Sequence, residues 1–483
     1  MNQKSENGLP KDYLLLTPFF LFFILLTWAT SDNIFFWDTI QLGAKHAIFY
    51  YENNFSEILL PDSFDSGHIP AFGMYLALCW KLFGKSLLVS HFSMLPFLLG
   101  IVWQSYLLVK KYISRKYLFL ALIIFLADPT LLGQAILISP DIPLVFLFLM
   151  GLNSVLRNNN LLLILSITGL FLVSMRGMMV AFAIFLLDII FNIQFSGIKK
   201  VVIQLLKKSR VYLPGFIIFL AFSIYHYKMK GWIGYHDDSP WSESFVKVEL
   251  MGILYNLGIF AWRLWDFGRI ILWIVFLFIV VSQFRKLKLD KTFHQLLIIL
   301  LVVGVSLSIS FILYKYLSGH RYILPVYLAF SLLTPYLVFE KLKSKKTRYF
   351  MFSLMLVALL SGNFWIYPSR IAQGWDASLA HLPYYKLRDN MMNYMEENGI
   401  ELEDVGSAFP NNMKQKYIQL NDSDKKHCEL NLEKNQYILY SNVYNDFSDE
   451  QVDQMENNFI LEKGMKKRGV FIRLYRRPDS DGN

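Results

Sequence analysis

The run LLLTPFFLFFILLTWAT, Leu14 to Thr30, is apolar and long enough to cross a bilayer as a helix. A polar interval, residues 31–70, follows it and carries Asp38, Asp65 and His68 between aromatic-rich flanks. Two carboxylates and an imidazole directly after a membrane span are typical of an active-site loop at the membrane surface. An ordinary extramembrane connection with solvated aspartates is the alternative.

The composition of the chain sets its class. Of 483 residues, 55% are hydrophobic and only 17% are charged, which excludes an ordinary soluble domain and predicts a polytopic α-helical membrane protein. The net charge of +10 is attributed to cytoplasmic loops rather than to nucleic-acid binding, because Lys and Arg collect on the inner side of membrane proteins. Cys79 and Cys428 form no disulfide framework, and no Gly-rich phosphate loop supports a nucleotide-driven pump.

Hydropathy predicts about eleven membrane-spanning helices, since a helix needs about 20 apolar residues to cross the hydrocarbon core. The apolar segment 69–83 is shorter than this and is assigned to the interface or to a re-entrant loop. The predicted spans are 14–30, 87–109, 117–135, 142–156, 161–173, 178–195, 211–227, 270–284, 294–314, 322–339 and 349–366.

Charge predicts the orientation. With the N-terminus in the cytoplasm and segment 69–83 not crossing, every strong basic cluster falls on the inner side. These clusters are 110–116, Arg157, 199–210, 285–291 and 341–348. The outer side then receives 31–70, the turn 128–141, Arg176, the segment 228–269, 318–321 and everything after residue 367. The sequence therefore predicts a multi-pass inner-membrane protein whose candidate chemistry faces away from the cytoplasm.

After the membrane domain, residues 1–366, the chain becomes polar and mixed in charge. Short β-rich runs alternate with helical patterns, so residues 367–483 are predicted to form a small extracytoplasmic α/β domain. The predicted strands are 436–443, 458–462 and 469–475, and the predicted helices are 384–397 and 448–456.

Several motifs together resemble one family of membrane enzymes. The motifs Asp38-Thr39-Ile40-Gln41, Phe-Asp-Ser-Gly-His-Ile-Pro (64–70) and Leu-Phe-Gly-Lys-Ser (82–86) resemble the first outer loop of GT-C glycosyltransferases. This group includes protein O-mannosyltransferases, aminoarabinose transferases acting on lipid A, and bacterial dolichyl-phosphate-mannose-type proteins. Ser-Pro-Asp-Ile-Pro-Leu (139–144) resembles the second acidic turn of the family, and His-Arg-Tyr-Ile-Leu-Pro (320–325) its late Arg-Tyr-x-x-Pro signature. The resemblance covers residues 14–325.

The resemblance implies a GT-C fold and a transferase that moves a hexosyl or pentosyl group from a polyprenyl-phosphate donor. The acceptor would be an envelope protein, lipid A or another glycan at the outer face of the membrane. By analogy, Asp38 is the expected general base for the acceptor hydroxyl, with Asp65 as a second catalytic carboxylate. Arg321 is expected to bind the donor phosphate through paired guanidinium bonds. His68, His320 and Tyr322 are expected to contact the donor or the acceptor.

The chemistry implied by the resemblance requires no cofactor, and a divalent metal is an open alternative. Many relatives carry Asp-Glu where this chain has Asp38-Thr39, and a threonine cannot replace a carboxylate. This departure argues against a metal held between two first-loop acids. It leaves the base role to Asp38 alone or to Asp38 together with Asp65.

Other positions have two interpretations each. Asp141 is either a substrate-binding residue or the cap of a helix. Arg176 is either a functional cation at membrane depth or one that snorkels to the interface. His236-Asp237-Asp238 is more typical of an exposed loop than of a metal or acceptor site. Gly374-Trp375-Asp376 either contacts substrate or packs the tail against the membrane domain.

The number of predicted spans also fits two other classes of protein. A lipid or solute transporter would usually show paired broken helices in related halves, and the sequence contains no such repeat. A polysaccharide polymerase or ligase uses the same lipid carriers, but its large outer loop normally comes late between spans. Here the functional loop is the first, and the large polar domain is terminal.

Overall fold

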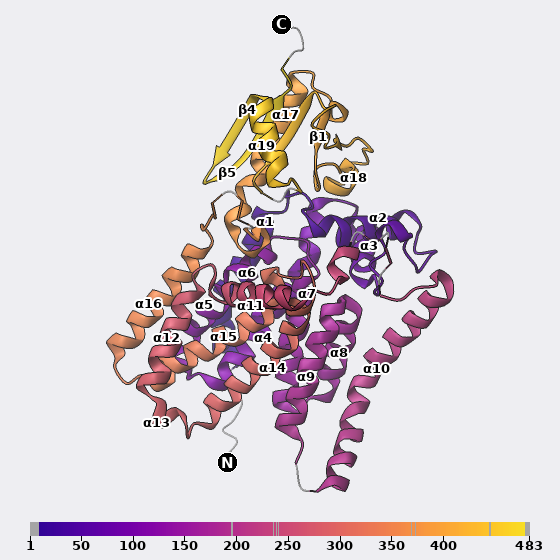
Figure 1. Cartoon of the computed structure of the whole chain (residues 1–483). Coiled ribbons are helices and arrows are strands. Elements are labelled where there is room, and N and C mark those ends of the chain that lie inside the picture. Colours follow the sequence, from indigo (N-terminus) through magenta and orange to yellow (C-terminus); the bar gives the residue numbers. More distant parts are fainter. Residues whose placement is uncertain are drawn as a thin grey trace.

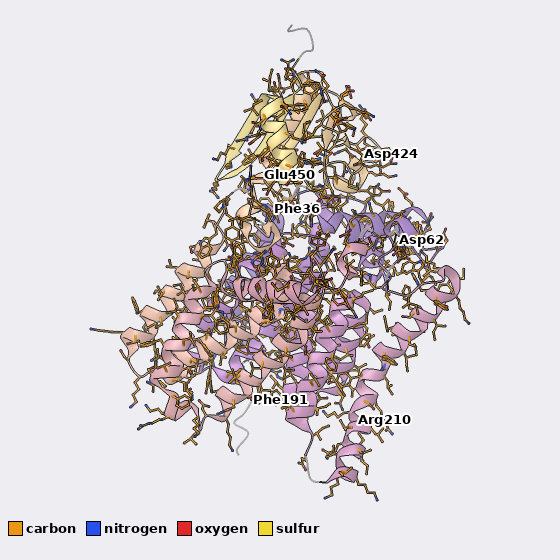
Figure 2. The ribbon with its side chains drawn as sticks, viewed as in Figure 1. Phe36, Asp62, Phe191, Arg210, Asp424 and Glu450 are labelled. Carbon is orange, nitrogen blue, oxygen red and sulfur yellow. The ribbon has the colours of Figure 1, made fainter. Side chains whose placement is uncertain are left out.

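The computed structural model describes residues 9–478 except 195, 196, 235, 238, 240, 369, 372, 444 and 445. Most of these residues form one bundle of helices, and a small sheet domain covers one end of it (Figure 1). We call this end of the bundle the domain end. Arg210 and the helix α13 (Phe284–Leu287), which carries Arg285 and Lys286, lie toward the opposite end (Figures 1 and 2). These two basic segments and the sheet domain thus lie toward opposite ends of the bundle.

The apolar segments form the bundle because a helix satisfies all of its own backbone groups, which hydrocarbon cannot do. Every predicted span overlaps one or two bundle helices. The helices are α1 (Leu9–Ala29), α4 (Leu87–Tyr112), α5 (Leu118–Leu126), α6 (Pro129–Ala135), α7 (Asp141–Arg157), α8 (Asn160–Val173), α9 (Met175–Asn192), α10 (Ile198–Lys230), α11 (Leu250–Trp265), α12 (Arg269–Ser282), α14 (Lys291–Leu313), α15 (Leu324–Tyr336) and α16 (Lys345–Gly362).

Four described helices are long and apolar enough to cross a membrane alone, or six if each of two bent pairs counts as one span. The four are Leu87–Tyr112, Met175–Asn192, Lys291–Leu313 and His320–Lys341, the last being α15 with its flanking turns. The larger count predicted from hydropathy includes shorter apolar helices such as α8. That larger count stays a prediction.

One predicted span is broken rather than straight. Segment 117–135 divides at Asp128 into α5 and α6, which are bent by 67°. The Asp128 carboxylate accepts hydrogen bonds from the amides of Thr130, at 2.9 Å, and Leu131, at 3.2 Å. Pro129 begins α6, and this N-cap arrangement starts a new helix direction inside an apolar run.

The segment 228–269, predicted as an outer connection, contains the helix α11. It is bent by 85° relative to α12. The helix α11 is not predicted from the sequence, because Asn256 and Arg263 interrupt its apolar run. Both residues are buried in the structure. The two bent pairs meet through a buried ion pair: Arg269 at the start of α12 donates to both oxygens of Asp128, at 2.8 and 2.7 Å.

The Thr130 hydroxyl extends this ion pair to the C-terminal tail. It accepts from Arg269 Nη2 at 2.7 Å and donates to the Ala377 carbonyl at 3.1 Å. We expect Thr130→Val to lower stability by about 1–3 kcal/mol, because both partners lose a buried hydrogen bond. The measurement is the thermal unfolding midpoint in detergent. Thr334→Val is the matched control, since that buried hydroxyl bonds Phe330 O within its own helix; equal midpoints for the two variants would contradict the link to the tail.

The first connection lies across the domain end of the bundle (Figure 1). It comprises the π-helix η1 (Ile40–Lys45), α2 (His46–Glu52), the 3-10 turn η2 (Asp62–Phe64) and α3 (Ala71–Phe83). The thirteen residues of α3 rise only about 20 Å, less than the hydrocarbon core of about 30 Å. That segment 69–83 does not span the membrane stays a prediction.

The tail folds into a five-stranded sheet with helices, so the predicted α/β architecture is confirmed. Its strand order is β2-β1-β3-β5-β4, with β1 parallel to β2 and β3 and with β5 antiparallel to β3 and β4. The elements are the 3-10 turns η7 (Trp375–Ala377) and η8 (Leu379–His381), α17 (Pro383–Glu397), β1 (Val405–Ser407), α18 (Gln415–Ile418), β2 (Cys428–Glu429), β3 (Tyr437–Ser441), α19 (Asp449–Asn458), β4 (Ile460–Lys467) and β5 (Val470–Arg476). Since α16 ends at Gly362, the predicted boundary at 366 falls between it and these elements.

Candidate active site

Three carboxylates meet on one guanidinium at the domain end. Arg321 lies in the 3-10 turn η5 (His320–Ile323) directly before α15 and is only 8% exposed. Its Nη2 pairs with Asp38, its Nη1 lies 3.1 Å from Asp376 Oδ2, and its Nε lies 3.7 Å from Asp141 Oδ2. The two residues that the sequence assigns to proton transfer and phosphate binding, Asp38 and Arg321, are therefore in direct contact.

A second arginine joins this cluster. Arg176, in the first turn of α9, pairs with Asp141 through Nη1, and its guanidinium lies 4.2 Å from the centre of the Tyr322 ring. The Arg321 guanidinium lies 5.1 Å from the centre of the same ring, so both cations contact one aromatic side chain. Asp141 is the first residue of α7, and its side chain caps no helix amide. Both Asp141 and Arg176 thus belong to the cluster, which we call the Arg321 cluster.

The loop before η1 holds Asp38 in place. Trp37 has a φ of 51°, a left-handed conformation that bulky residues adopt only when their surroundings impose it. The Thr39 hydroxyl accepts from the Phe36 amide at 2.7 Å and donates to the Phe36 carbonyl at 2.8 Å. The Phe36 ring stacks on His381 of the tail at 5.3 Å. Thr39 therefore shapes the turn that presents Asp38.

Asp376 reaches the cluster from the tail. The turn η7 packs directly on α6, where a Cβ on Gly133 would lie 2.8 Å from the Asp376 carbonyl oxygen. Gly374, with a φ of +61°, allows the approach on the other side, since a Cβ there would lie 2.8 Å from His320 Nδ1. Sequence analysis left Asp376 between substrate contact and packing. Its one signal was the Gly-Trp-Asp motif soon after the last predicted span.

Exposure separates the three carboxylates. The Asp38 side chain is 22% exposed, whereas those of Asp141 and Asp376 are 3% and 8% exposed. With two guanidinium groups against three carboxylates, the Arg321 cluster carries one net negative charge. Asp38 is therefore the acid that can leave Arg321 for solvent or substrate at the lowest cost in buried charge.

Asp65 belongs to a different cluster. Its Oδ2 lies 2.8 Å from Lys230 Nζ and 3.1 Å from His226 Nε2, and its Oδ1 accepts from the Gly67 amide at 2.9 Å. The residue is 2% exposed, so these bonds satisfy a buried carboxylate and tie the first loop to the end of α10. The structure does not bring Asp65 to Asp38. His226 and Lys230 are not predicted as site residues from the sequence, where their one signal is a basic group at the end of a span on the predicted outer side.

Charged residues of both clusters, Asp65 and Arg176, act on His68. Burial lowers the pKa of His68 from 6.5 to about 4; the Asp65 charge raises this pKa and the Arg176 charge lowers it. The Ser66 hydroxyl hydrogen-bonds His68 Nδ1. With Pro140 and other neighbours, His68 lines a cavity of about 10 Å³, which has room for about one water molecule and no substrate.

The depressed pKa of His68 predicts acid sensitivity. The unfolded chain takes up this proton near pH 6.5 and the folded chain only near pH 4, so stability should fall as the pH drops through that window. We expect His68→Asn to lose less stability than the native chain over the window. Thermal midpoints at its two ends measure this, with His294→Asn, at an exposed position, as the control; parallel pH profiles for the native and His68→Asn chains would refute it.

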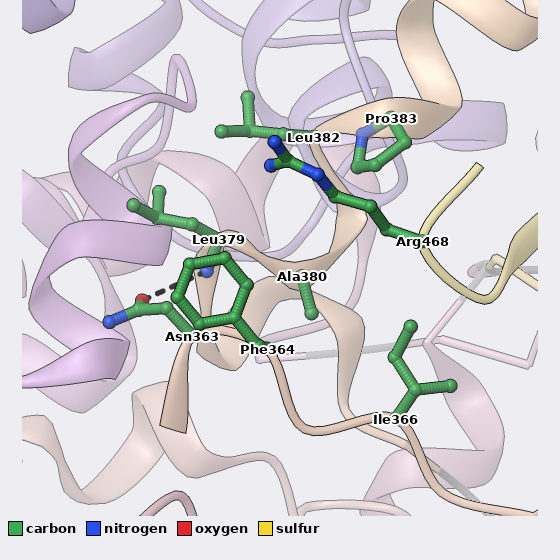
Figure 3. A pocket seen from close by; sticks show the side chains of 8 residues that line it. All are labelled: Asn363, Phe364, Ile366, Leu379, Ala380, Leu382, Pro383 and Arg468. Carbon is green, nitrogen blue, oxygen red and sulfur yellow. Dashed lines mark hydrogen bonds between the residues drawn. The ribbon is translucent and has the colours of Figure 1, made fainter. Parts of the chain in front are cut away.

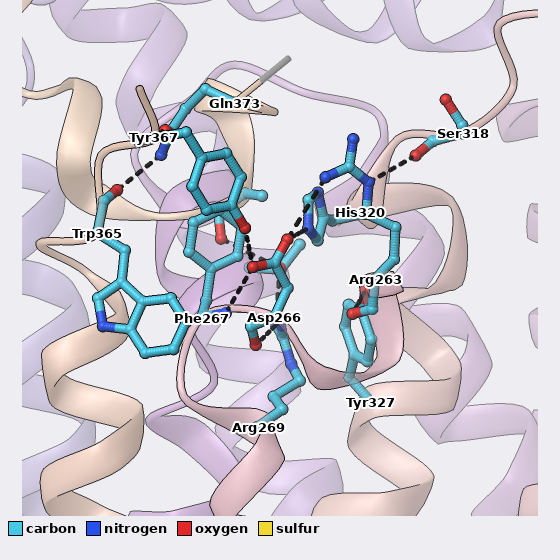
Figure 4. Close-up of polar contacts among 12 residues, drawn as sticks. Arg263, Asp266, Phe267, Arg269, Ser318, His320, Tyr327, Trp365, Tyr367 and Gln373 are labelled. Carbon is cyan, nitrogen blue, oxygen red and sulfur yellow. Dashed lines mark hydrogen bonds and ion pairs between the residues drawn. The ribbon is translucent and has the colours of Figure 1, made fainter. Parts of the chain in front are cut away.

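His320 is not part of the Arg321 cluster, although it precedes Arg321. Its Nε2 lies 2.7 Å from Asp266 Oδ2, and Asp266 also contacts Arg263 and Tyr367 (Figure 4). His320 is fully buried at the break between α11 and α12. The structure places His320 outside the Arg321 cluster, and its contact with substrate stays a prediction. Its hydrogen bond with Asp266 anchors η5 and so positions Arg321.

Among the described residues, no group of three or more His, Cys, Asp or Glu side chains is arranged to hold a metal ion. In the Arg321 cluster, each carboxylate faces guanidinium nitrogens. In segment 236–238, for which the sequence favours an exposed loop over a metal or acceptor site, His236 bonds the Asp62 carbonyl at 3.0 Å, and Asp238 lies outside the described residues.

The chain therefore combines a bundle of apolar helices, a first loop across one end, and a terminal α/β domain over a buried acid and arginine cluster. Comparison with solved structures finds a similar fold in ArnT from Cupriavidus metallidurans, in agreement with the resemblance of the motifs to GT-C proteins. In the apo state the TM-score is 0.51 at 11% identity, covering 96% of this chain and 98% of that one. Bound to undecaprenyl phosphate the TM-score is 0.50 at 10% identity, covering 95% and 97%.

Arabinofuranosyltransferase AftD from Mycobacteria is also similar, with a TM-score of 0.49 at 11% identity over 97% of this chain and 40% of that one. Neither a family model nor a curated protein sequence matches the chain.

Proposed function

We propose that this chain is an integral membrane glycosyltransferase that moves a sugar from a polyprenyl-phosphate donor to an envelope acceptor. The observation that carries the proposal is the contact of Asp38 with Arg321, which joins a carboxylate able to accept a proton to a cation able to hold phosphate. The likeness to ArnT, a structure of which holds undecaprenyl phosphate, supports the lipid-carrier class. The acceptor is a protein, lipid A or another glycan, and the group transferred is hexosyl or pentosyl.

The charges suggest how the donor enters. A phosphate brought to the net negative Arg321 cluster must replace an anion on a guanidinium rather than add to it. Asp38 is the most exposed of the three acids, so the phosphate exchanges with Asp38 on Arg321. Asp141 and Asp376 keep holding the guanidinium in place. Donor binding thereby frees the carboxylate that the acceptor needs.

The Arg321 cluster can then provide both groups that the transfer step needs, a base for the acceptor proton and cations for the leaving phosphate. Freed Asp38 takes the proton of the acceptor hydroxyl as its oxygen bonds the anomeric carbon of the sugar. The bond from that carbon to the phosphate oxygen breaks, and the electron pair leaves with the polyprenyl phosphate. Arg321, with Arg176 beside it over Tyr322, stabilises the charge that develops there. We propose that no cofactor is needed, with a divalent metal as the alternative; transfer in the presence of a chelator separates the two.

We further propose that the domain end faces out of the cytoplasm, with the N-terminus inside. We expect a membrane-impermeant maleimide to label Lys426→Cys on intact cells and Lys288→Cys only after permeabilisation, in a background of Cys79→Ser and Cys428→Ser. Both lysines are exposed, and they lie in the tail domain and in the basic segment after α13. Labelling in the opposite order would reverse the orientation.

The proposed function is tested by glycan and lipid profiling of a deletion strain. We expect one envelope component to lose a single sugar, which identifies the acceptor class. Native chain should restore the sugar and the Asp38→Asn chain should not. A profile unchanged by deletion, or restored equally by both chains, would overturn the proposal.

A further inference from the structure

A pocket of about 370 Å³ lies where α16 gives way to the tail domain (Figure 3). Apolar side chains form most of its wall, including Phe364, Ile366, Leu379 and Leu382. Arg468 is the one charged residue among the eight that line it. The volume is within the range of small-ligand sites, and the lining includes no member of the Arg321 cluster.

The pocket lies next to the end of α16, which overlaps the last span predicted from the sequence. Phe364 and Trp365 directly follow α16, and aromatic residues after a span are typical of the interface between hydrocarbon and water. The Phe364 side chain is 68% exposed. The turn between β4 and β5 reaches down to this point, since a Cβ on Gly469 would lie 2.7 Å from Ile366 Cδ1. One wall is thus the end of an apolar helix and the other is a soluble hairpin.

The hairpin turn is basic, and no acidic side chain among the described residues pairs with its three cations. Lys466, Lys467 and Arg468 are consecutive and exposed. Arg473 and Arg476, farther along the same hairpin, pair with Glu456 and Glu462. Arg468 by contrast has no hydrogen-bond or ion-pair partner within the part of the chain that the structure describes. A guanidinium beside an apolar pocket at an interface matches a molecule with a phosphate and a hydrocarbon chain.

We propose that this pocket binds one anionic phospholipid of the bilayer, with its phosphate on Arg468 and the first part of its acyl chain against Phe364, Leu379 and Leu382. A bulk phospholipid fits better than the lipid-linked donor, because the pocket has no carboxylate that could act on a sugar. Leu379 and Ala380 of η8 line the pocket, while Asp376 of the adjacent η7 meets Arg321. The lipid would therefore brace the segment that carries Asp376. The proposal does not depend on the transfer reaction.

Native mass spectrometry of the full-length detergent-solubilised protein tests this, with phosphatidylglycerol and undecaprenyl phosphate titrated separately. We expect Arg468→Gln to weaken phosphatidylglycerol binding about tenfold, the loss of one direct charged hydrogen bond to the phosphate. Lys467→Gln is the matched control, since it removes the same charge from the same turn but lies outside the lining; it should change binding by less than roughly twofold. Leu382→Trp, which fills the pocket without changing charge, should also weaken binding.

Each possible binding result supports or overturns the proposed phospholipid site. Selective loss of phosphatidylglycerol in Arg468→Gln and Leu382→Trp supports a built lipid site. Equal losses in Arg468→Gln and Lys467→Gln would mean diffuse attraction to a basic surface and would overturn it. Loss of undecaprenyl phosphate with phosphatidylglycerol unaffected would assign the pocket to the lipid-linked substrate instead. Because the readout is binding, failure of the proposed glycosyl transfer leaves this test intact.

Discussion

Asp38→Asn is expected to reduce sugar transfer by about 10²–10⁴-fold, the usual contribution of a positioned general base. An asparagine side chain still accepts a hydrogen bond from Arg321, so the turn at Thr39 and the fold should persist. The substitution also removes one negative charge from the Arg321 cluster, which makes it more favourable for an incoming phosphate. We therefore expect kcat to decrease by this factor, while the KM for the polyprenyl-phosphate donor is unchanged or lower.

The control for Asp38→Asn is Asp62→Asn in the same loop. Asp62 is 62% exposed and pairs with Lys230, so the same chemical change there should leave transfer within about twofold. Steady-state kinetics with purified protein and a lipid-linked donor measure both variants. If Asp38→Asn raised the donor KM and left kcat unchanged, Asp38 would be a donor-binding residue and another group would be the base.

The helices could be predicted from the sequence because membrane burial requires long apolar runs, and such runs are visible without any tertiary information. Breaks within those runs were harder to see. In the sequence, Asp128 and Pro129 fit the end of a span as well as a break within one. Only the ion pair of Asp128 with Arg269, seen in the structure, shows that two bent helix pairs meet there. Long-range pairing between buried charges leaves no local pattern.

Some residues of the candidate site could likewise be predicted from the sequence, and others could not. Asp38 and Arg321 were found through family motifs, and their contact spans 283 positions that no periodicity connects. The resemblance assigns Asp65 a catalytic role with Asp38, but in the structure this buried carboxylate pairs with Lys230, which can neutralise it, and hydrogen-bonds His226. Asp376 could not be assigned, since its position depends on how the tail packs onto α6.

Arg321→Lys is expected to lower kcat/KM for the donor by about 10²–10³-fold, because lysine keeps the charge but not the fork that binds phosphate oxygens in pairs. The native guanidinium spreads its nitrogens over Asp38, Asp141 and Asp376, and a single ammonium cannot reach all three. We therefore also expect a lower thermal midpoint, as buried Asp141 and Asp376 lose part of their compensation. The loss should be largest in donor KM, since the phosphate then meets a cluster that no longer offers a paired site.

Arg176→Lys is the matched comparison for Arg321→Lys, because Arg176 pairs with one carboxylate, Asp141, and lies over the same Tyr322 ring. It should cost donor affinity about tenfold, the value of one charged hydrogen bond. Binding of undecaprenyl phosphate without acceptor separates capture of the donor from chemistry in both variants. Native affinity for undecaprenyl phosphate in Arg321→Lys, with kinetics lost, would move Arg321 from donor binding to the transfer step alone. Native kinetics in that variant would remove Arg321 from the mechanism, and with it the exchange of phosphate for Asp38.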